Sequence, residues 1–197
     1  MIKTIIFDVG GVFVKGSFDP FLKEVSEILG VELRRDSIPE EIMDDWMRGK
    51  VTFVEFLEKI SGLTLSKEDA KRIFDFWINN WEIDSDMIEF ARRFKRKYKL
   101  IMLSNADKEG VEKREKMGDQ LNFFDHKFRS FELGFVKPER EIYEHVLKKL
   151  KLNPKECVFI DDKPVNVEVA EELGIHGIVF QDKQQLIHDL QKLGVEV

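Results

Sequence analysis

Short apolar runs that alternate with helical periods constrain the fold of this chain more than any other feature of its sequence. A strand, helix, strand order repeated along a chain gives a parallel sheet with helices on both faces. We therefore expect a doubly wound α/β fold. The runs that we interpret as buried strands, because β-branched and aromatic residues favour this state, are TIIFDV at 4–9, KLIMLS at 99–104, CVFID at 157–161, GIVF at 177–180 and, more weakly, KFRSF at 127–131.

Apolar residues at helical spacing lie between these runs, so each set predicts an amphipathic helix that packs on the sheet. Together with the strands they indicate a Rossmann-like order of elements. The sets after residue 82 are Met87, Phe90, Ala91, Phe94 and Tyr98, then Tyr143, Val146, Leu147 and Leu150, then Leu186, Ile187, Leu190 and Leu193.

Residues 15–82 break the alternation, because they contain helical periods at 21–29 and 53–60 but no convincing strand. We predict a small α-helical cap domain at 15–82, inserted into a core domain of residues 1–14 and 83–197. Ligands of doubly wound sheets bind outside the carboxyl ends of the strands. An insertion that leaves the end of the first strand is placed to cover such a site.

Composition excludes several classes of partner. The formal net charge of −6 and the absence of a basic run argue against nucleic-acid binding. No stretch reaches the roughly 18 apolar residues that a membrane span needs. The single cysteine, Cys157, cannot form an intramolecular disulfide, and we expect a cytoplasmic protein that is a monomer or a homodimer.

Polar residues follow the first two core strands along the chain. Asp8 closes the first strand and precedes Gly10 and Gly11, which allow the backbone to turn tightly beside a ligand. Ser104 and Asn105 end the second strand, where a hydroxyl and an amide could bind phosphate oxygens. Alone, the aspartate could equally cap a turn, and the Ser-Asn pair could cap a helix.

Two further charged sites follow later in the chain. Lys137 precedes a helical period, where its charge opposes the helix dipole unless an anion is nearby. Asp161 and Asp162 end an apolar strand, and two adjacent carboxylates need a cation or protons to offset their repulsion. Oxygen ligands of this kind suit Mg²⁺. A helix cap explains one of these carboxylates but not both.

In this order the segments IIFDVGGV, LSNA, GFVKPER and FIDDKPVNVEVAEELGIHGIVF resemble the four motifs of the haloacid dehalogenase-like hydrolases. The resemblance covers nearly the whole chain. It implies a phosphatase with Mg²⁺ as cofactor and a small phosphorylated metabolite as substrate. The residue roles that it implies are Asp8 as nucleophile and metal ligand, Ser104 and Lys137 as groups that bind the phosphoryl group, Asp161 and Asp162 as metal ligands, Gly10 as a metal ligand through its backbone carbonyl, and Asn105 and Asn166 as further polar contacts.

The chain departs from most phosphatases of that family at Gly10, where a second aspartate usually protonates the leaving group and activates water. A subset with glycine here includes sugar-phosphate phosphatases with small helical caps. A general acid or base contributes about 10²–10⁴-fold. We therefore expect a substrate with a good leaving group, such as an anomeric sugar phosphate, an aryl phosphate or an acyl phosphate.

Two alternatives share the nucleophile position or the fold. A haloacid dehalogenase would use the same aspartate without metal, against which the Asp161-Asp162 pair argues. A weakly catalytic ligand-binding relative is favoured by Gly10. Lys15 and Ser17 are candidates for the group that helps water attack in place of the missing aspartate, and Arg48 is a candidate for substrate binding, but each is equally consistent with a plain surface residue. We interpret the aromatic residues of 46–81 mainly as the core of the cap.

Overall fold

The computed structural model describes residues 1–16 and 18–197. Its main sheet has five parallel strands in the order β5-β4-β1-β6-β7, which confirms the doubly wound α/β fold. Each predicted run overlaps one strand, although β5 and β7 begin one residue earlier than predicted and β1 ends before Asp8, where the chain turns. The strands are β1 (Thr4–Phe7), β4 (Lys99–Ser104), β5 (His126–Arg129), β6 (Cys157–Asp161) and β7 (His176–Val179).

Successive residues of the central strand β1 point to opposite faces of the sheet, as the pleat requires. Ile5 and Phe7 belong to one apolar cluster, and Ile6 belongs to a second. All three are buried, because helices cover both faces. This burial explains why the strands have continuous apolar sequences rather than alternating ones.

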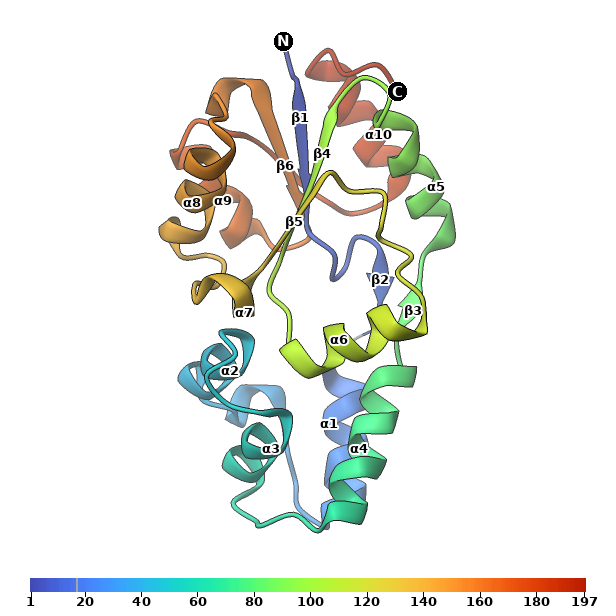
Figure 1. Ribbon diagram of the computed structural model, residues 1–197, viewed down its shortest axis with the longest axis vertical. Coiled ribbons are helices and arrows are strands. Elements are labelled where there is room, and N and C mark those ends of the chain that lie inside the picture. Colours follow the sequence, from blue (N-terminus) through green and yellow to red (C-terminus); the bar gives the residue numbers. More distant parts are fainter. Residues whose placement is uncertain (17) are drawn as a thin grey trace.

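Helices cover both faces of the sheet (Figure 1). Helices α5 (Ser85–Phe94) and α10 (Lys183–Lys192) share the cluster that includes Phe7. Helices α8 (Arg140–Leu150) and α9 (Pro164–Glu172) pack on the opposite face. The three helical periods predicted after residue 82 therefore form α5, α8 and α10.

Four helices occupy the opposite end of the molecule from the two termini (Figure 1). They have their own apolar cluster, in which the rings of Trp46 and Phe56 stack with centroids 4.1 Å apart. We call this group the four-helix unit. Its elements are α1 (Phe18–Leu29), the short 3₁₀ helix η1 (Arg35–Ser37), α2 (Glu40–Met47), α3 (Phe53–Ser61) and α4 (Lys67–Asn79).

The chain enters and leaves the four-helix unit through a small antiparallel ribbon of β2 (Val14–Lys15) and β3 (Glu82–Ile83). The sequence showed no strand pattern here, because two residues are too few to establish one. The ribbon keeps the two crossing segments side by side. The remaining elements are α6 (Lys108–Met117), α7 (Ser130–Leu133) and the 3₁₀ helix η2 (Pro154–Glu156).

Capping side chains fix where several helices begin. Thr52 and Glu55 form a reciprocal capping box at the start of α3, and Ser66 caps α4. Asp84 and Asp107 cap α5 and α6 in the same way. Within the described residues, none of these helices combines the length and the apolar character needed to cross a bilayer.

Candidate active site

Three central strands end at one edge of the sheet. Asp8 follows β1 directly, and its backbone N–H donates to the carbonyl of Ile160 on β6 (2.8 Å). Ser104 ends β4 and Asp161 ends β6, on either side of β1. The connections change direction at β1, and ligands of doubly wound sheets bind at such a point.

A buried lysine joins two of these strand ends. The Nζ atom of Lys137 lies 2.6 Å from Oδ1 of Asp8 and 2.6 Å from Oδ2 of Asp161. Only 2% of the Lys137 side chain and 10% of the Asp8 side chain are exposed, and Asp161 is fully buried. The loop before α8 thus brings its ammonium group between two carboxylates that are 153 residues apart in the chain.

The pKa values of these groups reflect burial as well as pairing. Burial raises the pKa of Asp8, attraction to Lys137 opposes the rise, and repulsion from Asp161 adds to it, so that the pKa is about 6. Burial alone would lower the pKa of Lys137, but the two carboxylates outweigh it and hold that pKa above its ordinary value. Near neutral pH the site therefore holds an ionised Asp8 beside a charged lysine.

Asp161 is held from two further directions. The side-chain amide of Asn166 donates to both carboxylate oxygens (2.9 and 3.0 Å), and the backbone N–H of Lys163 donates to Oδ1 (2.9 Å). Asn166 is itself fixed, because the hydroxyl of Tyr143 donates to its carbonyl (2.9 Å). The N-cap of α9 is Lys163, so neither Asp161 nor Asp162 is the cap of that helix.

Asp162 completes a set of three acidic groups. Asp8, Asp161 and Asp162 each offer a carboxylate oxygen, and these oxygens lie within 4.8 Å of one another. Burial and the charge of Asp161 raise the pKa of Asp162. Gly11 permits this approach, since a Cβ atom there would lie 2.4 Å from the carboxylate carbon of Asp162. Hard oxygen donors at this spacing fit Mg²⁺, which would relieve their mutual repulsion.

Asn105 ties the end of β4 to the lysine loop. Its side-chain amide donates to the carbonyl of Lys137 (2.9 Å), and its Oδ1 accepts from the N–H of Lys137 (2.8 Å). The hydroxyl of Ser104 donates to the carbonyl of Asn105 (3.4 Å) and faces a neighbouring cavity. The helix cap after this strand is Asp107, so a capping role does not account for Ser104 or Asn105.

The order and geometry of these segments agree with a comparison against protein families. A model described as haloacid dehalogenase-like hydrolase matches residues 2–174. The chain belongs to the haloacid dehalogenase-like hydrolases.

Named members of this family align with most of the chain. Bifunctional epoxide hydrolase 2 of Rattus norvegicus is 26% identical over 216 residues, which include 98% of this chain but only 39% of that protein. The chain thus spans well under half of that relative. D-ribitol-5-phosphate phosphatase of Bacteroides thetaiotaomicron is 27% identical over 186 residues, with 88% of this chain and 89% of the relative covered.

A solved structure of the family has the same fold. It is a haloacid dehalogenase family enzyme from Bacteroides thetaiotaomicron in complex with magnesium and inorganic phosphate. The TM-score is 0.79 at 25% identity, over 94% of this chain and 99% of that one. The likeness therefore covers the four-helix unit as well as the sheet.

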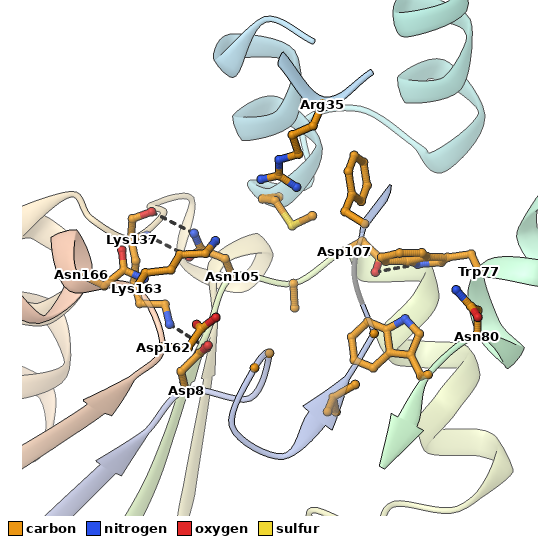
Figure 2. A pocket seen from close by; sticks show the side chains of 18 residues that line it. Asp8, Arg35, Trp77, Asn80, Asn105, Asp107, Lys137, Asp162, Lys163 and Asn166 are labelled. Carbon is orange, nitrogen blue, oxygen red and sulfur yellow. Dashed lines mark hydrogen bonds and ion pairs between the residues drawn. The ribbon is translucent and has the colours of Figure 1, made fainter. Parts of the chain in front are cut away.

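A cavity of about 310 Å³ lies between the strand ends and the four-helix unit. We call Asp8, Lys137, Asp161 and Asp162 the floor. We call the cavity-lining residues of the four-helix unit and of the segment that follows it the roof; Figure 2 shows the lining residues of both, which do not include Asp161. The floor residues that border the cavity are Asp8, Lys137 and Asp162, together with Gly10, Gly11, Asn105, Lys163 and Asn166 nearby. The roof residues are Phe18, Arg35, Met47, Trp77, Asn80 and Trp81.

Gly10 borders this cavity and has space for a side chain. A Cβ atom there would meet only Oδ2 of Asp8 within 4 Å, at 3.9 Å. Its φ angle lies outside the left-handed region, which contrasts with the φ of 75° at Gly11. Neither packing nor backbone conformation requires glycine at this position. The effect of Gly10 is therefore on the reaction, because the acid and base group that the family usually has here is missing.

The other candidates from the sequence are engaged elsewhere. Arg48 makes two 2.6 Å contacts with the carboxylate of Glu139, and Lys15 pairs with Asp84 (2.8 Å). Neither Arg48 nor Lys15 lines the cavity. Ser17 lies outside the described residues.

Sequence reasoning missed several residues that line the cavity. Asp107 is buried and accepts hydrogen bonds from the N–H of Gly110 (2.6 Å) and from the indole N–H of Trp77 (3.1 Å), which joins α6 to α4. An aspartate before the segment KEGV is a helix-cap signal that could have identified it. For Arg35 and Asn80 the sequence has no such signal.

The aromatic residues of the four-helix unit divide into two groups. Trp46 and Phe56 are fully buried in its core, as interpreted from their helical spacing. Trp77 belongs to this core and Trp81 packs against it, and both also line the cavity. The roof therefore presents aromatic surface to a ligand.

Proposed function

We propose that this hydrolase is a Mg²⁺-dependent phosphatase that acts on a small phosphorylated metabolite, with sugar phosphates among the candidates. The observation that supports this most directly is the floor, where Asp8 lies against Lys137 and within reach of Asp161 and Asp162. The phosphatase from Bacteroides thetaiotaomicron and the family structure with magnesium and phosphate point the same way.

Asp8 is the nucleophile in this proposal. Lys137 holds its Oδ1 atom, which leaves Oδ2 toward the cavity side where Gly10 lies. Oδ2 attacks phosphorus, the bond from phosphorus to the leaving oxygen breaks, and an aspartyl-phosphate forms. Water then attacks phosphorus, the bond to Asp8 breaks, and inorganic phosphate leaves.

The other floor residues hold charge around the reacting group. Lys137 neutralises a phosphoryl oxygen, and Asn105, which borders the cavity, donates a hydrogen bond to that group. Ser104 faces the neighbouring cavity, so its hydroxyl would have to turn toward the floor to donate a second one. Asp8, Asp161, Asp162 and the backbone carbonyl of Gly10 would hold Mg²⁺. When bound, the ion supplies positive charge to the phosphoryl oxygens.

No side chain at Gly10 gives a proton to the leaving oxygen, so this oxygen takes its proton from water. The substrate then needs a leaving group that is stable as an anion, such as an aryl, acyl or anomeric oxygen. We expect rates to fall steeply as the pKa of the leaving alcohol rises. Equal kcat/KM for alkyl and aryl phosphates would contradict this.

We further propose that residues 15–82 act as a cap domain on a core of residues 1–14 and 83–197. The separate apolar cluster of the four-helix unit and its position over the strand ends support this division. A cytoplasmic location, a small-molecule substrate and a monomeric or homodimeric state complete the proposal.

Hydrolysis of a panel of phosphorylated metabolites with Mg²⁺ tests the function. We expect phosphate release that a chelator abolishes and that Asp8→Asn removes, whereas Asp19→Asn, an exposed change on α1, retains it. Release of halide from 2-haloacids without metal would instead indicate the dehalogenase.

A non-catalytic binding protein is the second candidate, and Gly10 is the observation that favours it. This candidate predicts that phosphate binds with Mg²⁺ while no phosphate ester in the panel turns over. Turnover that depends on Asp8 excludes it.

A further inference from the structure

Arg35 is a cation of the roof that points into the cavity from the first residue of η1 (Figure 2). Its side chain has no hydrogen-bond or ion-pair partner among the described residues. The guanidinium carbon lies 4.9 Å from the ring centroid of Phe18, a contact that holds the group beside the cavity without neutralising its charge.

The other arginines of the four-helix unit are all paired with acids. Arg34 contacts Asp36 (3.1 Å), Arg48 contacts Glu139 (2.6 Å), and Arg72 approaches Glu24 (3.8 Å). None of these three lines the cavity. Among the four arginines of this unit, Arg35 is therefore the one that lines the cavity and whose guanidinium group has no acidic partner among the described residues.

The phosphoryl group has its own partners at the floor. Lys137 and the three acidic groups lie together there, and Figure 2 shows Arg35 on the other side of the cavity from Asp8. Trp77, Trp81 and Asn80 line the same cavity and offer aromatic and amide surface to a carbon skeleton. The cavity of about 310 Å³ has room for a small molecule that spans the two ends.

We propose that Arg35 is a specificity-determining residue that binds a second oxyanion of the substrate, at the end remote from the phosphoryl group that is hydrolysed. The substrate class is then a small phosphate ester that also has a carboxylate or a second phosphate. Both groups match the planar, bidentate geometry of a guanidinium. This inference rests on the proposed phosphatase function and names the substrate class of the same site.

Binding of phosphonates, which are not hydrolysed, tests the proposal independently of turnover. The probes are ω-phosphonocarboxylates with two to five methylene groups, the terminal bisphosphonates of the same lengths, and alkylphosphonates that lack the second anion. Their Kd values are measured by calorimetry with Mg²⁺ present. We expect wild type to prefer at least one doubly anionic probe over its alkylphosphonate by about 10- to 100-fold, as for hydrogen bonds between charged groups. The arm with the larger preference identifies the second oxyanion.

Variants then assign that preference to one residue. Arg35→Gln should bring the ratio of the Kd of the alkylphosphonate to the Kd of the doubly anionic probe to near one. Arg34→Gln, a matched change at the neighbouring ion-paired arginine, should leave this ratio as in wild type. Equal Kd values for all probes in wild type, or a preference that survives in Arg35→Gln, would overturn the proposal. Failure of every phosphonate to bind would overturn the proposed phosphate site as well, so the two failures are distinguishable.

Discussion

The floor and the roof of the cavity differ in how their charged groups are satisfied. At the floor, Lys137 and Asp161 are buried and each has at least two charged or hydrogen-bonded partners. At the roof, Arg35 is exposed and Asn80 borders the cavity beside two tryptophans. A side chain that is buried and bonded to several partners is fixed in one position. A side chain without such partners can still bind a ligand.

We infer from this difference that the floor carries out the reaction and that the roof selects the substrate. The floor is built from the ends of β1 and β6, whose relative positions the sheet fixes, and from Lys137 in the loop before α8. The roof comes from the four-helix unit and the segment that follows it, and side-chain contacts such as Arg48 to Glu139 and Trp77 to Asp107 connect this unit to the rest of the molecule. Changes at the floor should therefore alter catalysis and stability together, and changes at the roof should alter ligand preference.

A carboxylate added to the floor at Gly10 has the largest expected effect. The backbone and the free space there accept a side chain. We expect Gly10→Asp to raise kcat for alkyl phosphates about 10²–10⁴-fold, because the new group can protonate the leaving oxygen, with a smaller gain for aryl phosphates. Gly10→Asn is the matched control, and equal rates for the Asp and Asn variants would exclude acid catalysis as the cause.

Removal of the floor cation should destabilise the fold. Lys137→Met leaves Asp8 and Asp161 facing each other while buried, and we expect a loss of about 3–5 kcal/mol in the free energy of unfolding at pH 8 without metal. The loss should be smaller at pH 5, where Asp8 is protonated. Urea denaturation measures both. Lys163→Met is the control, because Lys163 borders the same cavity without an ion pair among the described residues, and a similar loss there would contradict the account.

Magnesium should offset the loss of stability that ionisation of Asp8 causes as the pH rises. The pKa of Asp8 is about 6 in the folded protein, above the value of about 3.9 for an unfolded chain, so ionisation disfavours the metal-free fold. The contribution of Asp8 to the free energy of unfolding is therefore fully present below about pH 4, where the carboxyl is protonated, and is lost as the pH rises through 6. At 100 times its Kd, Mg²⁺ should restore about 2.7 kcal/mol at pH 7.5. Thermal unfolding checks this, and an Mg²⁺ effect as large at pH 5 would contradict it.

Loss of the contact between the four-helix unit and the loop that carries Lys137 should have the smallest effect. Arg48→Met leaves Glu139, two residues after Lys137, without its bidentate partner, and we expect a loss of about 1–3 kcal/mol. The control is Arg140→Met, which removes a solvent-exposed pair with Glu144 and should cost less than about 1 kcal/mol. Equal losses in chemical denaturation would show that the Arg48–Glu139 contact is no stronger than a surface pair.

The strands and the floor were predictable because they follow local rules. Apolar runs identified the five core strands, and polar residues directly after them met at one edge, as parallel strands require. Asp8, Asn105 and the Asp161-Asp162 pair were found this way. Lys137 was found from a charge that opposes the dipole of the following helix.

The roof was not predictable in the same way. Whether Arg35 or Arg48 faces the cavity depends on how α2 and η1 pack against the core, and two arginines look alike in sequence. The two arginines differ because Glu139, 91 residues after Arg48, pairs with Arg48 and not with Arg35. The ribbon of β2 and β3 and the capping role of Asp107 also depend on contacts between distant segments.

The central claim is that one carboxylate, Asp8, accepts the phosphoryl group. Incubation with beryllium fluoride and Mg²⁺ mimics the aspartyl-phosphate, and a structure of that complex shows where the fluoride group is attached. We expect it on Oδ2 of Asp8, in contact with Lys137 and with the metal between Asp8, Asp161 and Asp162. A fluoride group bound elsewhere, or none bound at saturating concentrations, would contradict the account.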